Sequence, residues 1–240
     1  MKTGTKTAVA PRELTQRYRH ELKYFISFTD HKVLSDILAD TLQADPHSNR
    51  QNEYWIRSLY FDTPGNNDYY EKMIGVDRRK KVRLRIYHTD QPEVNVEIKY
   101  KVNEYILKET ALVTREDAAA LINGNKEILL NYHNTILNQV YYIMSKDLYR
   151  PVVIVDYERE AYISPTQDIR ITFDKSIRGS SVDFDLFSKD INMSPVFDEK
   201  TMVMEIKYNH FFPDWLRSVL SLSSGERYAI SKYCLSRSIY

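Results

Sequence analysis

Charged and apolar residues alternate along several segments of this chain, and this alternation is the feature that most constrains its fold. Residues 81–87 read KVRLRIY, so cations occupy one set of alternate positions and apolar residues mostly occupy the other. Residues 96–101, VEIKYK, repeat the separation. Because successive side chains of a strand point to opposite faces of a sheet, both segments predict strands with one apolar face and one charged face.

The same pattern recurs in the segments around residues 19–26, 157–161, 169–174 and 204–208. A single charged face of this kind is typical of a half-buried sheet that faces water. Taken together, however, the six charged faces carry an excess of cations in a chain whose net charge is only +1. The ten cations are Arg19, Lys23, Lys81, Arg83, Arg85, Lys99, Lys101, Arg159, Arg170 and Lys207, and the four anions are Glu21, Glu97, Asp174 and Glu205. Like charges on paired strands repel, so this crowding predicts a bound polyanion.

The strands predict an α+β fold in which an antiparallel β-barrel forms a tunnel with a polar, cationic interior and helices pack on its outside. Turns are expected at 62–67, 102–104 and 177–181, where polar residues or glycine gather. Helices are expected to begin near Thr29 or Asp30 and to occupy 117–123, 127–148, 214–222 and 226–236.

Residues 1–16 are expected to be a flexible N-terminal arm and residues 17–240 a single domain. The chain lacks a run of about 20 apolar residues and the apolar core of a signal peptide, so we expect a cytoplasmic protein without a membrane span. The near-neutral net charge gives no reason to expect nucleic acid as a partner. One cysteine, Cys234, excludes an intramolecular disulfide and a thiolate metal cluster.

Arginine and lysine in such numbers suit a chain of phosphoryl groups, because arginine offers a planar fork of donors and lysine a compact charge. Glu21 and Glu205 stand out on the cationic faces. Either carboxylate could hold a divalent metal, or it could form an internal ion pair with a neighbouring cation. The sequence contains no glycine-rich P-loop and no HExxH zinc motif.

An ordered set of motifs from about Tyr18 to the C-terminus resembles the VTC domain of polyphosphate polymerases, which belongs to the CYTH-like triphosphate tunnel metalloenzyme superfamily. The motifs are RHELKY at 19–24, IRSLYFDT at 56–63, RxRxY at 83–87, EIK at 97–99, YxR at 157–159, RITFD at 170–174 and EIK at 205–207. The resemblance implies a barrel that binds a nucleoside triphosphate and transfers its terminal phosphoryl group to a growing polyphosphate chain, assisted by Mn or Mg.

Position by position, the resemblance implies roles for individual residues. The reacting phosphates would be held by Lys23, Arg83, Arg85 and Lys99, and the remaining phosphate contacts would come from Lys108, Arg159, Arg170, Lys207, Ser231 and Lys232. Glu205 would bind the metal, and Glu21 is the second candidate ligand. Ser231 and Lys232 would lie at the product end of the tunnel.

The first strand departs from the ExExK motif of the hydrolytic branch, because Arg19 stands where that branch has its first glutamate. This argues against a triphosphatase that uses several metals. The expected function is therefore an ATP-dependent polyphosphate polymerase, whose partners are a nucleoside triphosphate and polyphosphate. Two alternatives stay open: a metal-dependent inorganic or nucleoside triphosphatase, and a non-catalytic sensor of polyphosphate or nucleotide.

Overall fold

A computed structural model describes residues 20–103, 105–164, 166, 168–209 and 212–238. The expected arm at 1–16 and Arg19 lie outside these residues. The strands are β1 (His20–Ser27), β2 (Gln43–Ala44), β3 (Glu53–Asp62), β4 (Arg78–Ile86), β5 (Glu93–Val102), β6 (Tyr105–Thr114), β7 (Arg150–Ser164), β8 (Ile169–Ser180), β9 (Ser194–Pro195), β10 (Thr201–Tyr208) and β11 (Glu226–Arg227). The helices are α1 (Phe28–Thr41), α2 (Asn67–Met73), α3 (Arg115–Ile122), the 3-10 helix η1 (Glu127–Tyr132), α4 (Thr135–Lys146), α5 (Asp214–Leu220) and α6 (Lys232–Arg237).

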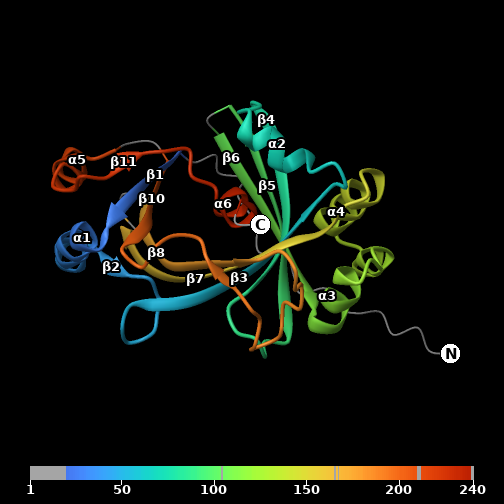
Figure 1. The fold of residues 1–240 in the computed structure, drawn as a ribbon. Coiled ribbons are helices and arrows are strands. Elements are labelled where there is room, and N and C mark those ends of the chain that lie inside the picture. Colours follow the sequence, from blue (N-terminus) through green and yellow to red (C-terminus); the bar gives the residue numbers. More distant parts are fainter. Residues whose placement is uncertain (1–19, 104, 165, 167, 210–211, 239–240) are drawn as a thin grey trace.

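The strands form one antiparallel sheet that bends into a trough (Figure 1). Its order is β11-β1-β10-β8-β7-β3-β4-β5-β6, with β2 paired to β7 and β9 paired to β8. The α+β class is confirmed. Within the described residues, however, no hydrogen-bonded ladder joins the two ends of the sheet, β11-β1 and β5-β6. The expected barrel is therefore an open trough, with a seam between these ends.

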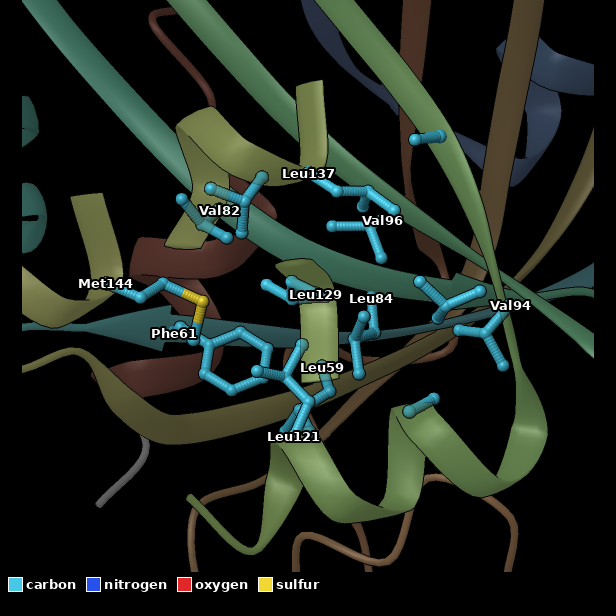
Figure 2. Packing of buried hydrophobic residues seen from close by; sticks show 14 of the residues in the cluster. Leu59, Phe61, Val82, Leu84, Val94, Val96, Leu121, Leu129, Leu137 and Met144 are labelled. Carbon is cyan, nitrogen blue, oxygen red and sulfur yellow. The ribbon is translucent and has the colours of Figure 1, made fainter. Parts of the chain in front are cut away.

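Helices cover the outer face of the trough, as expected. On one side, α3, η1 and α4 pack against the apolar faces of β3 to β6, where Leu84, Val96, Leu121 and Leu137 are fully buried (Figure 2). On the other side, α1 and α5 cover β1, β8 and β10 in a second apolar cluster. These are the apolar faces that the alternation identifies. No helix in the described part of the chain is both long and apolar enough to cross a bilayer.

The C-terminal helix α6 lies inside the trough (Figure 1). Its residues Tyr233 and Cys234 are buried against inward-facing apolar side chains of β3 and β7. Close packing against β8 depends on Gly179, because a Cβ built there would lie 2.8 Å from the Cβ of Ser236. The turn expected at 177–181 is therefore wrong: Gly179 permits the approach of α6, and β8 continues to Ser180.

Three other expectations about local structure were incomplete. The polar segment 62–67 leads into α2, because the Asp62 carboxylate accepts the backbone N–H groups of Asp68 at 3.0 Å and Tyr69 at 3.1 Å. The expected helix 127–148 is broken at Asn134, whose side chain caps α4. The helix expected at 226–236 begins only at Lys232 and ends at Arg237, since the N–H of Tyr228 donates to the carbonyl of Lys23 and the chain before Lys232 runs along β1.

Candidate functional site

A cavity of about 480 Å³ lies on the concave side of the trough, beside the start of α6. Its lining contains thirteen lysines and arginines but only two glutamates. The strands place these side chains there because the charged set of alternate positions faces inward while the apolar set is buried against the outer helices. The cationic faces expected from the sequence therefore converge on one cavity.

Ten of the twelve expected site residues line this cavity: Glu21, Lys23, Arg83, Arg85, Lys99, Arg159, Glu205, Lys207, Ser231 and Lys232. Two are not part of its lining. The ammonium of Lys108 lies 3.0 Å from Glu97, on the neighbouring strand β5. The guanidinium of Arg170 contacts the carboxylate of Asp45 and donates to the Tyr54 hydroxyl at 2.7 Å. Neither side chain therefore belongs to the lining of the cavity.

Six further cations line the cavity without a role implied by the resemblance: Lys72, Arg79, Lys80, Lys81, Lys101 and Arg227. Lys81 and Lys101 belong to the charged faces that the alternation identifies, and the run RRKK at 78–81 marks Arg79 and Lys80 as part of a basic segment. Lys72 lies on α2 and Arg227 on β11, elements that the sequence patterns do not predict. No local signal could have assigned these two to the site.

Buried carboxylates form ion pairs with two of the arginines, Arg83 and Arg159. Glu97, 1% exposed, accepts from Nε of Arg83 at 2.6 Å and from Lys108. Burial alone would raise the pKa of Glu97, but Arg83 and Arg85 hold it well below its usual value. Asp174 is fully buried and binds Arg159 in the same way. Both acids are therefore ionised and fix the orientation of a guanidinium.

Glu21 and Glu205 flank Lys23. The Lys23 ammonium lies 3.5 Å from Glu21 and 3.7 Å from Glu205, and Glu205 also pairs with Lys207 at 3.0 Å. Burial would raise the pKa of Glu21, but Lys99 and Lys23 outweigh it and lower the pKa to about 2. For Glu205, burial is outweighed by Lys207 and Lys23, and the pKa lies well below its usual value. Both carboxylates are charged at neutral pH.

Arg85 and Lys81 are two of the cavity cations that have no carboxylate partner among the described residues. Arg85, 6% exposed, donates to the Ser58 hydroxyl and the Tyr157 hydroxyl, both at 3.1 Å. The Lys81 ammonium lies 2.8 Å from the Ser231 hydroxyl. Among the residues that the structure describes, neither has a carboxylate within ion-pairing distance. A buried or half-buried cation without a carboxylate in contact with it is costly, so these two positions favour an anionic ligand.

The ionisation of neighbouring groups shows how positive the cavity is. Burial would raise the pKa of the Tyr60 phenol, but Arg83, Arg85 and Lys81 lower it to about 8. Burial lowers the pKa of Lys81 to about 8. Burial also lowers the pKa of Lys99 to about 8, even though Glu21 acts in the opposite direction. A bound polyanion would offset this effect of burial and keep both lysines fully charged.

The described residues contain no group of three or more His, Cys, Asp or Glu side chains that could hold a metal by themselves. Glu21 and Glu205 nevertheless form an ionised pair on adjacent, directly paired strands, and both contact Lys23. Magnesium-type ions commonly use one or two carboxylates and take their other ligands from water and substrate phosphates. The pair therefore fits a metal that arrives together with a phosphate ligand.

An antiparallel sheet bent around a cavity lined in this way defines a triphosphate-tunnel fold. The residues that build it span the two walls of the trough and α6. The VTC domain family model matches residues 18–240, and the chain therefore belongs to the VTC domain family.

A solved structure with a very different sequence shares the architecture. A Hippeastrum protein described as a candidate adenylyl cyclase with a dominant triphosphatase activity is 13% identical, with a TM-score of 0.57 over 92% of this chain and 95% of that chain. A candidate adenylate cyclase from Bacillus halodurans is 10% identical, with a TM-score of 0.49 over 87% of this chain and 89% of that chain. At such identities the similarity concerns the fold alone. The sequence has no significant match among curated proteins.

Proposed function

We propose that this protein is a polyphosphate polymerase that transfers the terminal phosphoryl group of a nucleoside triphosphate, ATP in the first instance, to a growing polyphosphate chain. The observation that carries the proposal is the cavity lined by thirteen cations, of which Arg85 and Lys81 have no carboxylate partner among the described residues. A single phosphate needs far fewer donors, whereas a triphosphate and a product chain together use many. Membership of the VTC domain family supports the same activity.

Phosphoryl transfer depends mainly on positioning and charge stabilisation, and the cavity supplies both without a protein nucleophile. Lys23, Arg83, Arg85 and Lys99 would surround the reacting phosphoryl group, with Arg83 held rigid by Glu97. The product chain would follow the cations that continue along the cavity, Arg159, Lys207 and Lys232, with Ser231 beside them.

Lys108 and Arg170, which do not line the cavity, would contribute through residues that they contact. Lys108 shares Glu97 with Arg83, and so it affects the charge and position of that arginine. Arg170 fixes Tyr54, and it lies opposite Lys207 in the paired strands β8 and β10. These roles are indirect, so we expect their substitution to weaken activity less than substitution of Arg83 or Arg85.

Glu205 and Glu21 would hold the metal cofactor, Mn or Mg. When bound there, such an ion neutralises negative charge on the phosphates. Glu205→Gln should leave the fold intact but raise the concentration of Mn²⁺ required for half-maximal turnover. An unchanged Mn²⁺ requirement would show that Glu205 does not bind the metal.

The test of the activity is incubation of the purified protein with ATP and Mn²⁺, followed by separation of the products on a polyacrylamide gel and by ³¹P NMR. Polymerase activity yields ADP and long-chain polyphosphate. Arg85→Met serves as the inactive comparison. Salt-sensitive binding of triphosphate without turnover under any divalent metal would instead indicate a sensor that controls a partner protein.

The second candidate is a metal-dependent inorganic or nucleoside triphosphatase, for which the expected products are ADP and orthophosphate only. The observation that favours it is the ionised pair of Glu21 and Glu205 on adjacent strands. The triphosphatase activity described for the Hippeastrum protein of the same fold points the same way. We also propose a cytoplasmic location, where nucleoside triphosphates are available.

A further inference from the structure

Asp174 lies where three elements of the cavity wall meet. It is a residue of β8, its side chain is fully buried, and it faces the concave side of the trough. Its carboxylate contacts Arg159 from β7 and Lys232 from the start of α6. Both of these cations line the cavity, whereas Asp174 itself does not.

The contacts fix both partners. Arg159 donates from Nε to one carboxylate oxygen of Asp174 at 2.6 Å and from Nη2 to the other at 2.9 Å, which sets the plane of the guanidinium. The ammonium of Lys232 binds the second oxygen. Both cations also lie over the ring of Tyr157, at 5.2 Å for Arg159 and 4.9 Å for Lys232.

Without this acid, two cations from different elements would lie at the same aromatic ring and lose the buried carboxylate that both contact. Burial alone would raise the pKa of Asp174, but Arg159 and Lys232 lower it to about 2, so the carboxylate is charged at every physiological pH. Lys232 is the first residue of the six-residue helix α6, which makes this contact a tie between the helix and the sheet.

We propose that Asp174 is a positioning residue that holds Arg159 and Lys232 side by side, so that both cations bind one run of phosphoryl groups. The inference rests on the proposed function for the nature of the ligand. It requires only that the cavity binds a phosphate chain, and it holds whether the protein polymerises or hydrolyses that chain.

A matched control exists on the opposite face of the sheet, between β7 and β3 instead of between β7 and β8. Asp156 of β7 is 1% exposed and binds Arg57 through the same fork, with Nε at 2.7 Å and Nη2 at 2.8 Å. Neither residue lines the cavity. Asp156→Asn therefore removes the same kind of buried ion pair from the fold without touching the proposed site.

The experiment measures the binding of inorganic triphosphate by titration calorimetry, together with the thermal midpoint of each variant. Both Asp174→Asn and Asp156→Asn should lower the midpoint. Only Asp174→Asn should weaken triphosphate binding, by about tenfold, because each misplaced cation loses an oriented contact. Equal affinities for the two variants would overturn the inference.

A second measurement tests whether Asp174 affects triphosphate binding through Lys232, and it uses a second variant beside Asp174→Asn. Lys232→Met removes one of the two partners of Asp174. If Asp174 acts through Lys232, the substitution Asp174→Asn should lower triphosphate affinity less in the Lys232→Met protein than in the wild-type protein. Full additivity would overturn the inference. Should Asp174→Asn fail to fold, Asp174→Glu keeps the charge but displaces it, and undiminished triphosphate binding by that variant would also overturn the positioning role.

Failure of the proposed function gives a different result. A wild-type protein that binds triphosphate but forms only orthophosphate would refute the polymerase, while the difference between Asp174→Asn and Asp156→Asn would persist. A wild-type protein that does not bind triphosphate would refute both.

Discussion

Lys99 of β5 and Glu21 of β1 form an ion pair in which the ammonium lies 2.9 Å from both carboxylate oxygens, although their strands lie near opposite ends of the sheet. The seam between these ends has no hydrogen-bonded ladder in the described part of the chain. The rings of His20 and Tyr105 also approach across it, with centroids 5.9 Å apart. Side chains, rather than backbone pairing, therefore bring the two walls of the cavity together.

Lys99→Met should reduce triphosphate affinity by about tenfold, because it removes a phosphate donor and leaves Glu21 without its closest cation. The difference in affinity between wild type and Lys99→Met should shrink as salt is added, since screening weakens the electrostatic contribution of Lys99. Calorimetric titration at several ionic strengths measures both effects. Lys32→Met, which removes an exposed lysine on α1, is the control and should bind normally. Equal affinity of the two variants would mean that Lys99 does not contact the ligand.

Arg85 differs from the other buried arginines because no described carboxylate lies within ion-pairing distance of it. Replacing it with methionine removes a buried, unpaired charge and keeps most of the side-chain volume. We expect Arg85→Met to unfold in urea at the same or a higher denaturant midpoint than the wild-type protein, while triphosphate binding falls more than about tenfold. A large loss of stability with unchanged binding would assign Arg85 to the fold instead of the site.

The inward-facing half of the site could be predicted from the sequence because a strand has a side-chain period of two. Once Val82 and Leu84 are assigned to the core, Lys81, Arg83 and Arg85 must share the other face, whatever the neighbouring strands are. Taken together, the charged faces of the six strands carry an excess of cations, which predicts one common anionic ligand. In the structure, residues from all six of these strands line one cavity or contact its lining.

The remaining features depend on contacts between distant residues. Asp62 begins α2 by accepting backbone N–H groups six and seven residues later, and α2 brings Lys72 to the cavity. Gly179 looks like a turn residue in the sequence because its packing partner, Ser236, is distant along the chain. The displacement of Arg170 from the cavity likewise depends on Asp45, in a segment with no predicted role. Local periodicity contains no information about such pairs.

Asp68 gives the protein a pH-dependent stability that lies outside the cavity chemistry. It is 1% exposed, accepts the Tyr149 hydroxyl on both oxygens at 2.8 and 2.9 Å, and has Lys80 at 3.8 Å. Burial raises its pKa from 3.8 to about 7. Because the folded-state pKa lies above the unfolded value, the folded protein binds the proton more tightly between these two pH values. The contribution of Asp68 to the free energy of unfolding therefore falls as pH rises from 3.8 to about 7.

Asp68→Asn removes this titration and keeps an oxygen that can accept the Tyr149 hydroxyl. We expect the thermal midpoint of the variant, measured relative to wild type, to improve between pH 5 and pH 8. Asp90→Asn, at an exposed position, should track the wild-type protein across the same range. A constant difference between Asp68→Asn and wild type at all pH values would show that Asp68 does not titrate there.

Gly179→Ala tests whether the packing of α6 against β8 supports the cavity. The added Cβ would lie 2.8 Å from Cβ and 3.1 Å from Oγ of Ser236, so α6 must move away from β8. Overpacking of this kind costs about 1–3 kcal/mol of stability. Triphosphate binding should weaken as well, because Ser231 and Lys232 at the start of α6 line the cavity. Urea unfolding and triphosphate titration measure the two effects.

The rescue variant separates this clash from other effects of the substitution. Ser236→Gly removes the atoms that the new Cβ would meet, and it sacrifices no hydrogen bond, since the buried Ser236 hydroxyl has no partner in the described residues. Alone it should cost about 0.5–1 kcal/mol through the lower helix propensity of glycine. Combined with Gly179→Ala it should restore triphosphate affinity to the level of Ser236→Gly alone, because α6 can then return to β8. Continued weak binding in the double variant would show that contact between Gly179 and Ser236 does not set the position of Lys232.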